Sequence, residues 1–185
     1  FRSSRELWVY DARTETGMGM HGFSNEQIEM VKALGARIAR RTVYWWMGGR
    51  TLNPDGSIDY DTTRLKGIDD QVARAKEQGI ELDLIIAHPN GWENRHEIHR
   101  QYAHFAGFLA KRYPSVRYWE LGNEVESGWT DLFGAYRKGY HPFERGRCYA
   151  QMLKLAYPAI KEANPRAWVL FQGMGYPDPD FIRGV

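Results

Sequence analysis

Short apolar runs alternate with longer amphipathic segments along this chain, and this alternation limits the possible folds more than any other feature. The run at 82–88 (LDLIIAH) has the length and the near-continuous apolar character of a strand that is buried on both faces. The segments between such runs carry apolar residues at helical spacing. A repeated strand–helix order predicts an α/β fold with a parallel sheet covered by helices.

Turn and cap residues suggest where these elements begin and end. Ser24 with Gln27 three residues later fits a helix-starting capping box. Gly35 and Gly79 fit helix C-terminal caps, and 53–56 (NPDG) fits a turn. The expected helices follow Ser24 and span 62–78, 99–112 and 145–163, the last tolerating Pro158; the expected strands lie at 17–22, within 36–46, and at 82–88, 116–124 and 167–173. This order amounts to about four strand–helix units and a fifth strand.

Length and charge exclude several classes of protein. At 185 residues and 43% apolar content, the chain predicts a single domain over 1–185. The 25 Lys and Arg residues nearly balance 23 Asp and Glu residues and are scattered, so we expect neither a nucleic-acid partner nor a membrane surface. The apolar runs are far shorter than the roughly 20 residues of a membrane helix, which predicts a soluble protein. The single Cys148 leaves the compartment open between cytoplasmic and secreted.

Polar and aromatic residues stand at the ends of the expected strands. In parallel α/β folds the functional groups gather at the carboxyl ends of the strands. A lone His there more often bonds its neighbours, and Arg40 could simply neutralise a carboxylate. Trp45 and Trp46 point to opposite faces, so at most one of them lines a barrel mouth. The coincidence at successive strand ends nevertheless predicts a site made of His21, Arg40, Trp45, Trp46, His88, Asn123 and Glu124.

Three of these strand ends resemble a known group of enzymes. The segment 119–124 (WELGNE) resembles the fourth-strand signature of the retaining glycoside hydrolases built on the (β/α)8 barrel, the cellulase, β-xylosidase and β-galactosidase-like superfamily. The segment 33–46 resembles the second strand of that clan, in which a helix-ending Gly is followed five residues later by an Arg, here Arg40. The segment 84–89 (LIIAHP) resembles its third strand. The resemblance covers about 17–173.

This resemblance implies a carbohydrate substrate and a role for each matched residue. Glu124 would be the acid/base, while Asn123 and Arg40 would orient the substrate and the nucleophile. His21, His88 and one of the two Trp residues would line the sugar site, without metal or cofactor. Elementary chemistry agrees, because a general acid needs a partly desolvated carboxyl group and a neutral amide can bind a sugar hydroxyl without adding charge.

A second carboxylate is missing from this picture. Retaining enzymes place two carboxyl groups roughly 5 to 5.5 Å apart. Glu120 lies four strand residues before Glu124, which is about 13 Å along the backbone. Glu126 lies on the following loop, where its preorganisation is doubtful. The clan carries its nucleophile on the seventh strand and a full barrel takes about 250 residues, so we expect an incomplete barrel that is weak or inactive alone.

An incomplete barrel leaves its first and fifth strands as exposed edges. Association of copies would cover them, so we expect a homo-oligomer, most simply a dimer.

Two other functions remain open. One is a non-catalytic carbohydrate-binding or structural remnant of a barrel, which the aromatic-rich composition would suit. The other is a metal-dependent hydrolase, because His88, His96, His99 and His104 lie close in sequence. An HExxH pattern is absent, however, and so are the phosphate-binding glycine loops of nucleotide enzymes and the GxSxG of Ser hydrolases.

Overall fold

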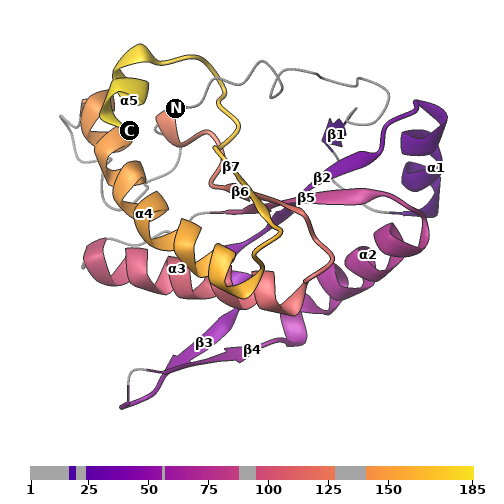
Figure 1. Ribbon diagram of the computed structural model, residues 1–185, viewed down its shortest axis with the longest axis horizontal. Helices are drawn as coiled ribbons and strands as arrows, with labels where there is room; N and C mark the ends of the chain where they lie inside the picture. The colour runs from indigo at the N-terminus through magenta and orange to yellow at the C-terminus, as the bar shows by residue number, and fades with distance from the viewer. Residues whose placement is uncertain (1–16, 20–23, 56, 88–94, 128–140) are drawn as a thin grey trace.

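The computed structural model describes residues 17–19, 24–55, 57–87, 95–127 and 141–185 (Figure 1). Within these ranges the main sheet is parallel, and its strands follow the order β1-β2-β5-β6-β7. Successive strands are therefore neighbours, as in the wall of a (β/α)8 barrel. The predicted partial barrel is confirmed, with strands β1 (Gly17–Gly19), β2 (Ile38–Val43), β5 (Glu81–Ile86), β6 (Tyr118–Leu121) and β7 (Trp168–Leu170).

The helices connect these strands and cover one side of the sheet (Figure 1). Helices α3 and α4 pack side by side along much of their length. Short 3-10 turns follow or precede the main elements at η2 (Trp45–Met47), η3 (Thr63–Leu65) and η4 (Val125–Ser127). The helices are α1 (Asn25–Ala33), α2 (Lys66–Glu77), α3 (Arg95–Arg112), α4 (Pro142–Ala163) and α5 (Pro179–Gly184).

The predicted helix ends are confirmed for α1 and α2. The Ser24 hydroxyl accepts the Gln27 backbone N–H at 3.3 Å, and the Gln27 side chain accepts the Ser24 N–H at 2.9 Å. Gly35 and Gly79 have φ angles of 71° and 68°. Only glycine adopts this left-handed conformation without strain, which explains why both helices end there.

Five elements differ from the sequence-based expectation. Two antiparallel strands, β3 (Gly49–Leu52) and β4 (Ile58–Asp61), stand on either side of the predicted turn, of which residue 56 lies outside the described residues, and the sequence did not predict them. This hairpin is held to α3 through Tyr60, whose ring stacks on Phe108 at 4.2 Å between centroids. Helices α3 and α4 begin earlier than expected, α4 because His141 caps a first turn that opens with Pro142. Helix α5 was not predicted either.

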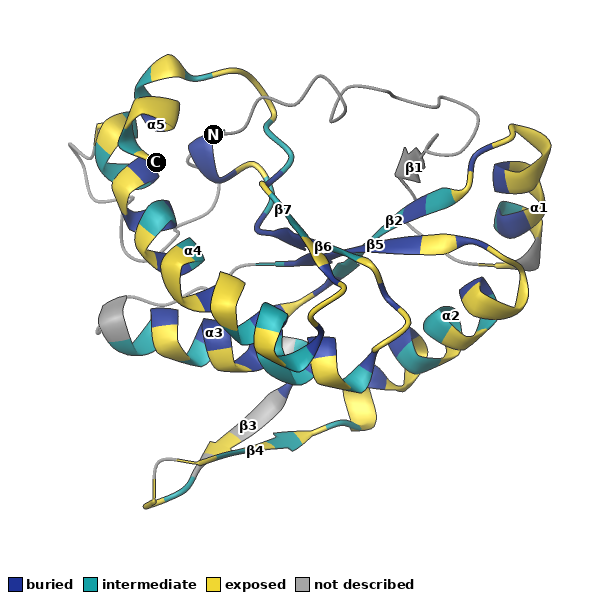
Figure 2. Ribbon diagram, viewed as in Figure 1, coloured by how far each residue is buried: buried dark blue, intermediate teal, exposed yellow. Residues whose placement is uncertain are grey.

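Alternation along the strands separates an apolar side of the sheet from a polar one. Buried positions concentrate on the strands and on the helix faces turned towards them (Figure 2). Most helix-facing positions are apolar, namely Ala39, Val43, Leu82, Leu84, Ile86, Trp119 and Leu121, whereas Arg41 on the same side donates to Gln71 of α2 at 2.9 Å. The intervening positions Arg40, Asp83 and Glu120 therefore point to the other face, which would be the barrel interior.

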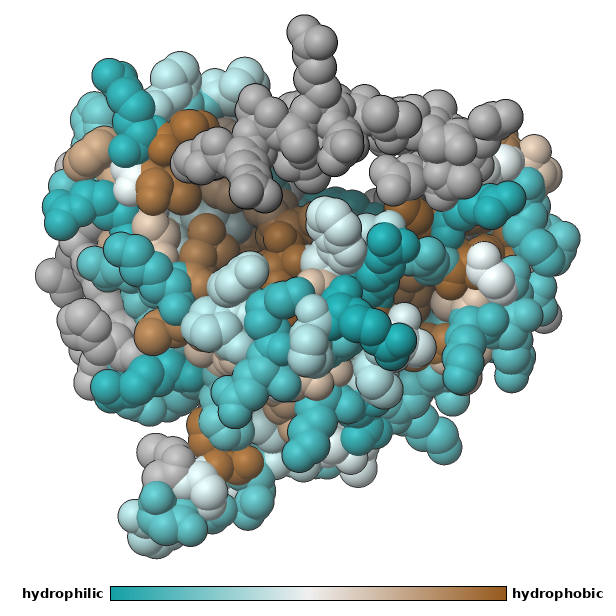
Figure 3. Space-filling model, in the orientation of Figure 1, coloured by the Kyte–Doolittle hydropathy of each residue, from teal (hydrophilic) through white to brown (hydrophobic). Residues whose placement is uncertain are grey.

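The surface seen in Figure 3 is mainly hydrophilic, with hydrophobic side chains showing mostly in the hollows between elements. None of the helices in the described ranges combines the length and the apolar character that crossing a membrane requires. Two large hydrophobic side chains near the β7 edge of the sheet are partly exposed, Trp168 at 50% and Phe171 at 41%.

Candidate active site

Arg40, Glu120 and Asn123 form one hydrogen-bonded group on the polar side of the sheet. The Arg40 guanidinium donates to both Glu120 carboxylate oxygens, from Nε at 2.7 Å and from Nη2 at 2.6 Å. Its Nη2 also donates to Asn123 Oδ1 at 2.7 Å. The bidentate pair fixes the guanidinium plane. Arg40 from β2 thus reaches the strand end that carries Asn123 and Glu124.

Asp83 adds a second buried carboxyl group to this cluster. It lies opposite Arg40 in the register of β2 and β5, and only 8% of its surface is exposed. Its Oδ1 has no hydrogen-bond partner among the described residues. Burial, and then the neighbouring Glu120 carboxylate, raise the pKa of Asp83 to about 7. The hydrogen bonds that Arg40 donates to the Glu120 carboxylate raise the pKa of Arg40, so Arg40 remains charged.

The chain leaves β6 through an unusual turn that carries the predicted acid/base residue. Gly122 has a φ angle of 88°, and Glu124 is non-glycine with a φ of 50°. Asn123 bridges to Gly173 beyond β7, and the Glu124 N–H donates to the Gly173 carbonyl at 2.8 Å. The Glu124 side chain is exposed, so the desolvated setting expected from the sequence is not provided by the described residues.

Gly173 approaches the cluster so closely that a side chain there would displace its neighbours. Its N–H donates to Glu120 Oε1 at 2.5 Å. A Cβ at this position would lie 2.8 Å from Arg40 Nη2 and 3.1 Å from Glu120 Oε1. The end of β7 is thereby tied to the ion pair.

The substitution Gly173→Ala is expected to lower the free energy of unfolding by about 1 to 3 kcal/mol, because the guanidinium must shift away from both partners. Chemical denaturation measures the loss. Gly67→Ala on α2 is the matched control, since a Cβ there meets nothing within 4 Å. It should be neutral or stabilising by up to about 1 kcal/mol. Equal losses in the two variants would contradict the crowding at Gly173.

The structure does not bring all the predicted residues to this site. Trp45 lies in the hydrophobic core, 7% exposed, with its ring stacked on Tyr102 at 5.9 Å and edge-on to Phe105 at 5.5 Å. Its placement therefore differs from the expected sugar-lining position, because η2 turns this side chain towards α3. The Trp46 side chain, His21 and His88 lie outside the described residues.

Sequence reasoning missed the partners that organise the site. From the sequence Glu120 is a candidate only for the second catalytic carboxylate, yet it is 4% exposed and accepts hydrogen bonds from Arg40 and Gly173. Glu126 is fully buried and bonded to Gln172 at 2.9 Å. Neither carboxylate is therefore placed to act opposite Glu124. The available signal was a charged residue inside an apolar strand, as with Asp83 and Glu120.

Histidines do not assemble a metal site in the described part of the chain. No three His, Cys, Asp or Glu side chains there lie close enough to hold a metal ion. The His104 Nδ1 lies 2.9 Å from the Tyr60 hydroxyl, and His99 is buried in α3. His88 and the His96 side chain are outside the described residues.

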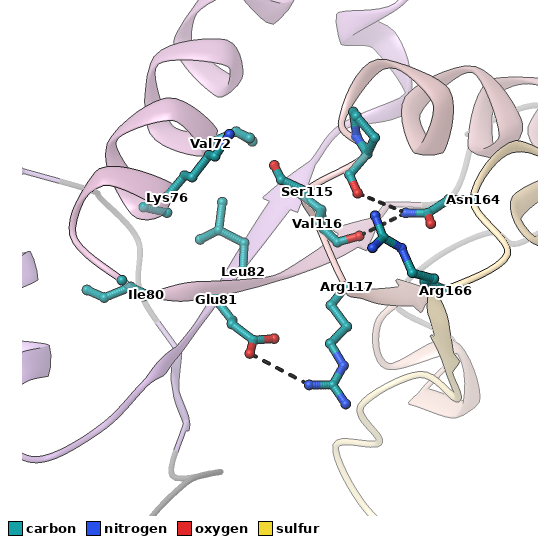
Figure 4. Close-up of a pocket in the computed structure, with 13 residues that line it drawn as sticks. Val72, Lys76, Ile80, Glu81, Leu82, Ser115, Val116, Arg117, Asn164 and Arg166 are labelled. Atoms are coloured by element: carbon teal, nitrogen blue, oxygen red, sulfur yellow. Dashed lines mark hydrogen bonds and ion pairs between the residues drawn. The ribbon is translucent and has the colours of Figure 1, made fainter.

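A groove of about 480 Å³ opens at the opposite, amino-terminal ends of the strands (Figure 4). Arg117 Nη1 and Glu81 Oε1 lie 3.7 Å apart in its lining. The Asn164 Nδ2 group donates to the Val116 carbonyl at 3.3 Å. Functional groups of barrel enzymes gather at the other end, so this groove is not the candidate site.

Several solved structures share the fold of this chain. A family 39 glycoside hydrolase from Bacteroides cellulosilyticus WH2 matches with a TM-score of 0.57 and 17% identity, over 88% of this chain and 32% of that one. The family 1 β-glucosidase of Thermotoga maritima matches with a TM-score of 0.59 and 17% identity, over 79% of this chain and 36% of that one. The virulence factor SghA of Agrobacterium tumefaciens matches with a TM-score of 0.59 and 16% identity, over 78% of this chain and 34% of that one. At this identity the likeness shows the fold, and the chain spans about a third of each neighbour.

Comparison with curated proteins finds no match. The family model described as cellulase (glycosyl hydrolase family 5) matches residues 9–179, which is nearly the whole chain. That range contains every strand of the parallel sheet and all residues of the Arg40 cluster. The chain therefore belongs to glycosyl hydrolase family 5.

Proposed function

We propose that this chain supplies the acid/base half of a retaining glycoside hydrolase that cleaves O-glycosyl bonds. The supporting observation is the contact between Arg40 Nη2 and Asn123 Oδ1 at 2.7 Å, next to Glu124. Because Oδ1 accepts from Arg40, we propose that the Asn123 Nδ2 group donates to a sugar oxygen. Glu124, directly after it, is exposed to an incoming ligand.

In this proposal Glu124 first gives its proton to the glycosidic oxygen of the leaving group. Asn123 binds the hydroxyl beside the reacting carbon, a contact that strengthens as positive charge develops on the sugar. Glu124 then takes a proton from the water that releases the sugar. The nucleophile is a carboxylate of a seventh barrel strand, which is not among the described strands, so this chain alone turns over slowly or not at all.

Glucoimidazole, which is bound in a solved complex of the Thermotoga maritima β-glucosidase, is a suitable probe. In this proposal a basic imidazole nitrogen accepts the proton that Glu124 would otherwise give to a glycosidic oxygen. We expect calorimetry to detect binding, and Glu124→Gln to weaken it by about 10-fold to 100-fold, the loss of one charge-assisted hydrogen bond.

Glu126→Gln is unsuitable as a control because Glu126 is buried, whereas Glu144→Gln changes a carboxylate of α4 that is 45% exposed and should keep full affinity. Binding that is independent of Glu124 would instead support a non-catalytic carbohydrate-binding protein. That alternative is favoured by one observation, the occupation of both Glu120 and Glu126 by structural partners.

Hydrolysis of an activated aryl glycoside tests the position of the nucleophile. We expect this chain to release little phenol above the uncatalysed rate. Substantial release that disappears in Glu124→Gln would support the acid/base role but show that a nucleophile lies within these residues.

We also propose that the sheet edges β1 and β7 are covered by a second copy of the chain. The half-exposed Trp168 and Phe171 near β7 support this idea, since apolar edges favour association. Light scattering at micromolar concentration should give the mass of a dimer. A monomeric mass would contradict the pairing.

A further inference from the structure

We propose that Glu126 and Gln172 form a positioning pair that holds the loop 172–176, between β7 and α5, against Glu124. The role of Glu124 as acid/base rests on the function proposed above, whereas the pair itself is a feature of the structure. Glu126 follows Glu124 by two residues on η4, and Gln172 comes 46 residues later, just beyond β7. The pair would therefore join the ends of two neighbouring barrel strands.

The Glu126 carboxylate is completely buried and accepts three N–H groups from this loop. It accepts from Gln172 Nε2 at 2.9 Å, from the Gly175 N–H at 2.5 Å and from the Tyr176 N–H at 3.3 Å. A buried charge is costly unless several donors surround it. The three donors all come from the loop, so the buried Glu126 carboxylate stabilises only the loop conformation that supplies them.

The orientation of the Gln172 amide is determined by a second set of contacts. Its Oε1 accepts the Val125 backbone N–H, so its Nε2 must face Glu126. Its backbone N–H donates to the Tyr149 hydroxyl at 3.1 Å, and Tyr149 in turn donates to the Leu121 carbonyl at 2.7 Å. A rotation of the amide would place its NH2 against the Val125 N–H, so the amide cannot reverse without losing a bond.

The loop held in this way lies directly against Glu124. A Cβ on Gly175 would be 3.3 Å from the Glu124 carboxyl carbon. At the other end of the loop, the Gly173 carbonyl accepts the Glu124 N–H at 2.8 Å. Glu124 has a left-handed backbone, which is strained for a non-glycine residue and persists only where the surroundings impose it. Breaking the hydrogen bond between Glu126 and Gln172 should therefore leave the Glu124 side chain without a fixed orientation.

Exchanging the two side chains tests the pair. Glu126→Gln alone sets one amide NH2 against another, and Gln172→Glu alone sets two carboxylates against each other. In the double variant Glu126→Gln/Gln172→Glu an amide donor again faces a carboxylate acceptor. The new carboxylate at position 172 accepts from both the Val125 N–H and the new amide at position 126, and that amide oxygen still accepts from Gly175 and Tyr176. Side-chain size and net charge are unchanged by the exchange.

Amide hydrogen exchange measured by NMR tests the role of the pair without any sugar ligand. We expect the Glu124 and Gly175 amides to exchange at least about ten-fold faster in each single variant and to recover in the double variant. Glucoimidazole affinity should fall and recover in the same order, which a general loss of stability would not reproduce. Unchanged Glu124 exchange in both single variants, or a double variant no better than the singles, would overturn the inference. A wild-type protein that binds no glucoimidazole contradicts the proposed function, while the amide rates still decide the pair.

Discussion

Replacing Glu120 by Gln is expected to lower the free energy of unfolding by about 3 kcal/mol, because breaking a buried ion pair leaves an uncompensated charge. The Glu120 side chain is 5% exposed and that of Arg40 is 34% exposed, so the loss should lie at the lower end of the range for fully buried pairs. An amide at this position cannot accept from Arg40 Nε, Arg40 Nη2 and the Gly173 N–H at once. Denaturant unfolding at neutral pH measures the change through its midpoint, with an unchanged slope.

Glu81→Gln is the matched control for this experiment. Glu81 also pairs with an arginine, Arg117, but at 3.7 Å and with both side chains nearly half exposed. Exposed pairs contribute about 0 to 1 kcal/mol, so this variant should unfold almost as the wild type does. Similar small losses in the two variants would mean that Arg40 finds another partner or water when Glu120 is neutralised.

The stability of the protein is expected to fall as pH rises towards 8, and Asp83→Asn is expected to remove much of that fall. The pKa of Asp83 is raised from 3.8 to about 7 in the folded chain. A raised carboxyl pKa means that the fold prefers the protonated form, so its contribution is complete below about 4 and is lost as pH rises through about 7. At 1.36 kcal/mol per pKa unit, this amounts to roughly 4 kcal/mol between the two limits.

Asparagine imitates the protonated carboxyl group at every pH. Asp83→Asn should therefore match the wild type near pH 4 and exceed its unfolding free energy near pH 8. Asp70→Asn, an exposed Asp on α2, is the control and should give a difference that does not change with pH. Denaturation curves at a series of pH values provide both differences. A constant difference for Asp83→Asn would show that Asp83 does not titrate between these limits, because the positive charge of Arg40 then outweighs burial and the Glu120 carboxylate.

The strand–helix order was predictable from the sequence because its signals are local. Apolar runs of strand length, the Ser24 capping box and Gly35 each act within a few residues, and all of them are confirmed. The hairpin of β3 and β4 was not predictable in this way. Its strands are short and partly exposed, and their position depends on Tyr60 packing against α3, which lies more than 40 residues away.

The same distinction holds at the candidate site. The residue types at the strand ends, Arg40, Asn123 and Glu124, were evident from the sequence, because parallel strands bring their carboxyl ends to one edge. Their partners were not, since Glu120 is 80 residues from Arg40 and Gln172 is 46 residues from Glu126. Burial decides whether such carboxylates are structural or reactive, and burial is a property of the assembled sheet. The sequence by itself determined which side chains reach the strand ends; only the tertiary structure decided that Glu120 and Glu126 serve as buried acceptors while Glu124 stays open, because the surrounding donors and the packing come from distant segments.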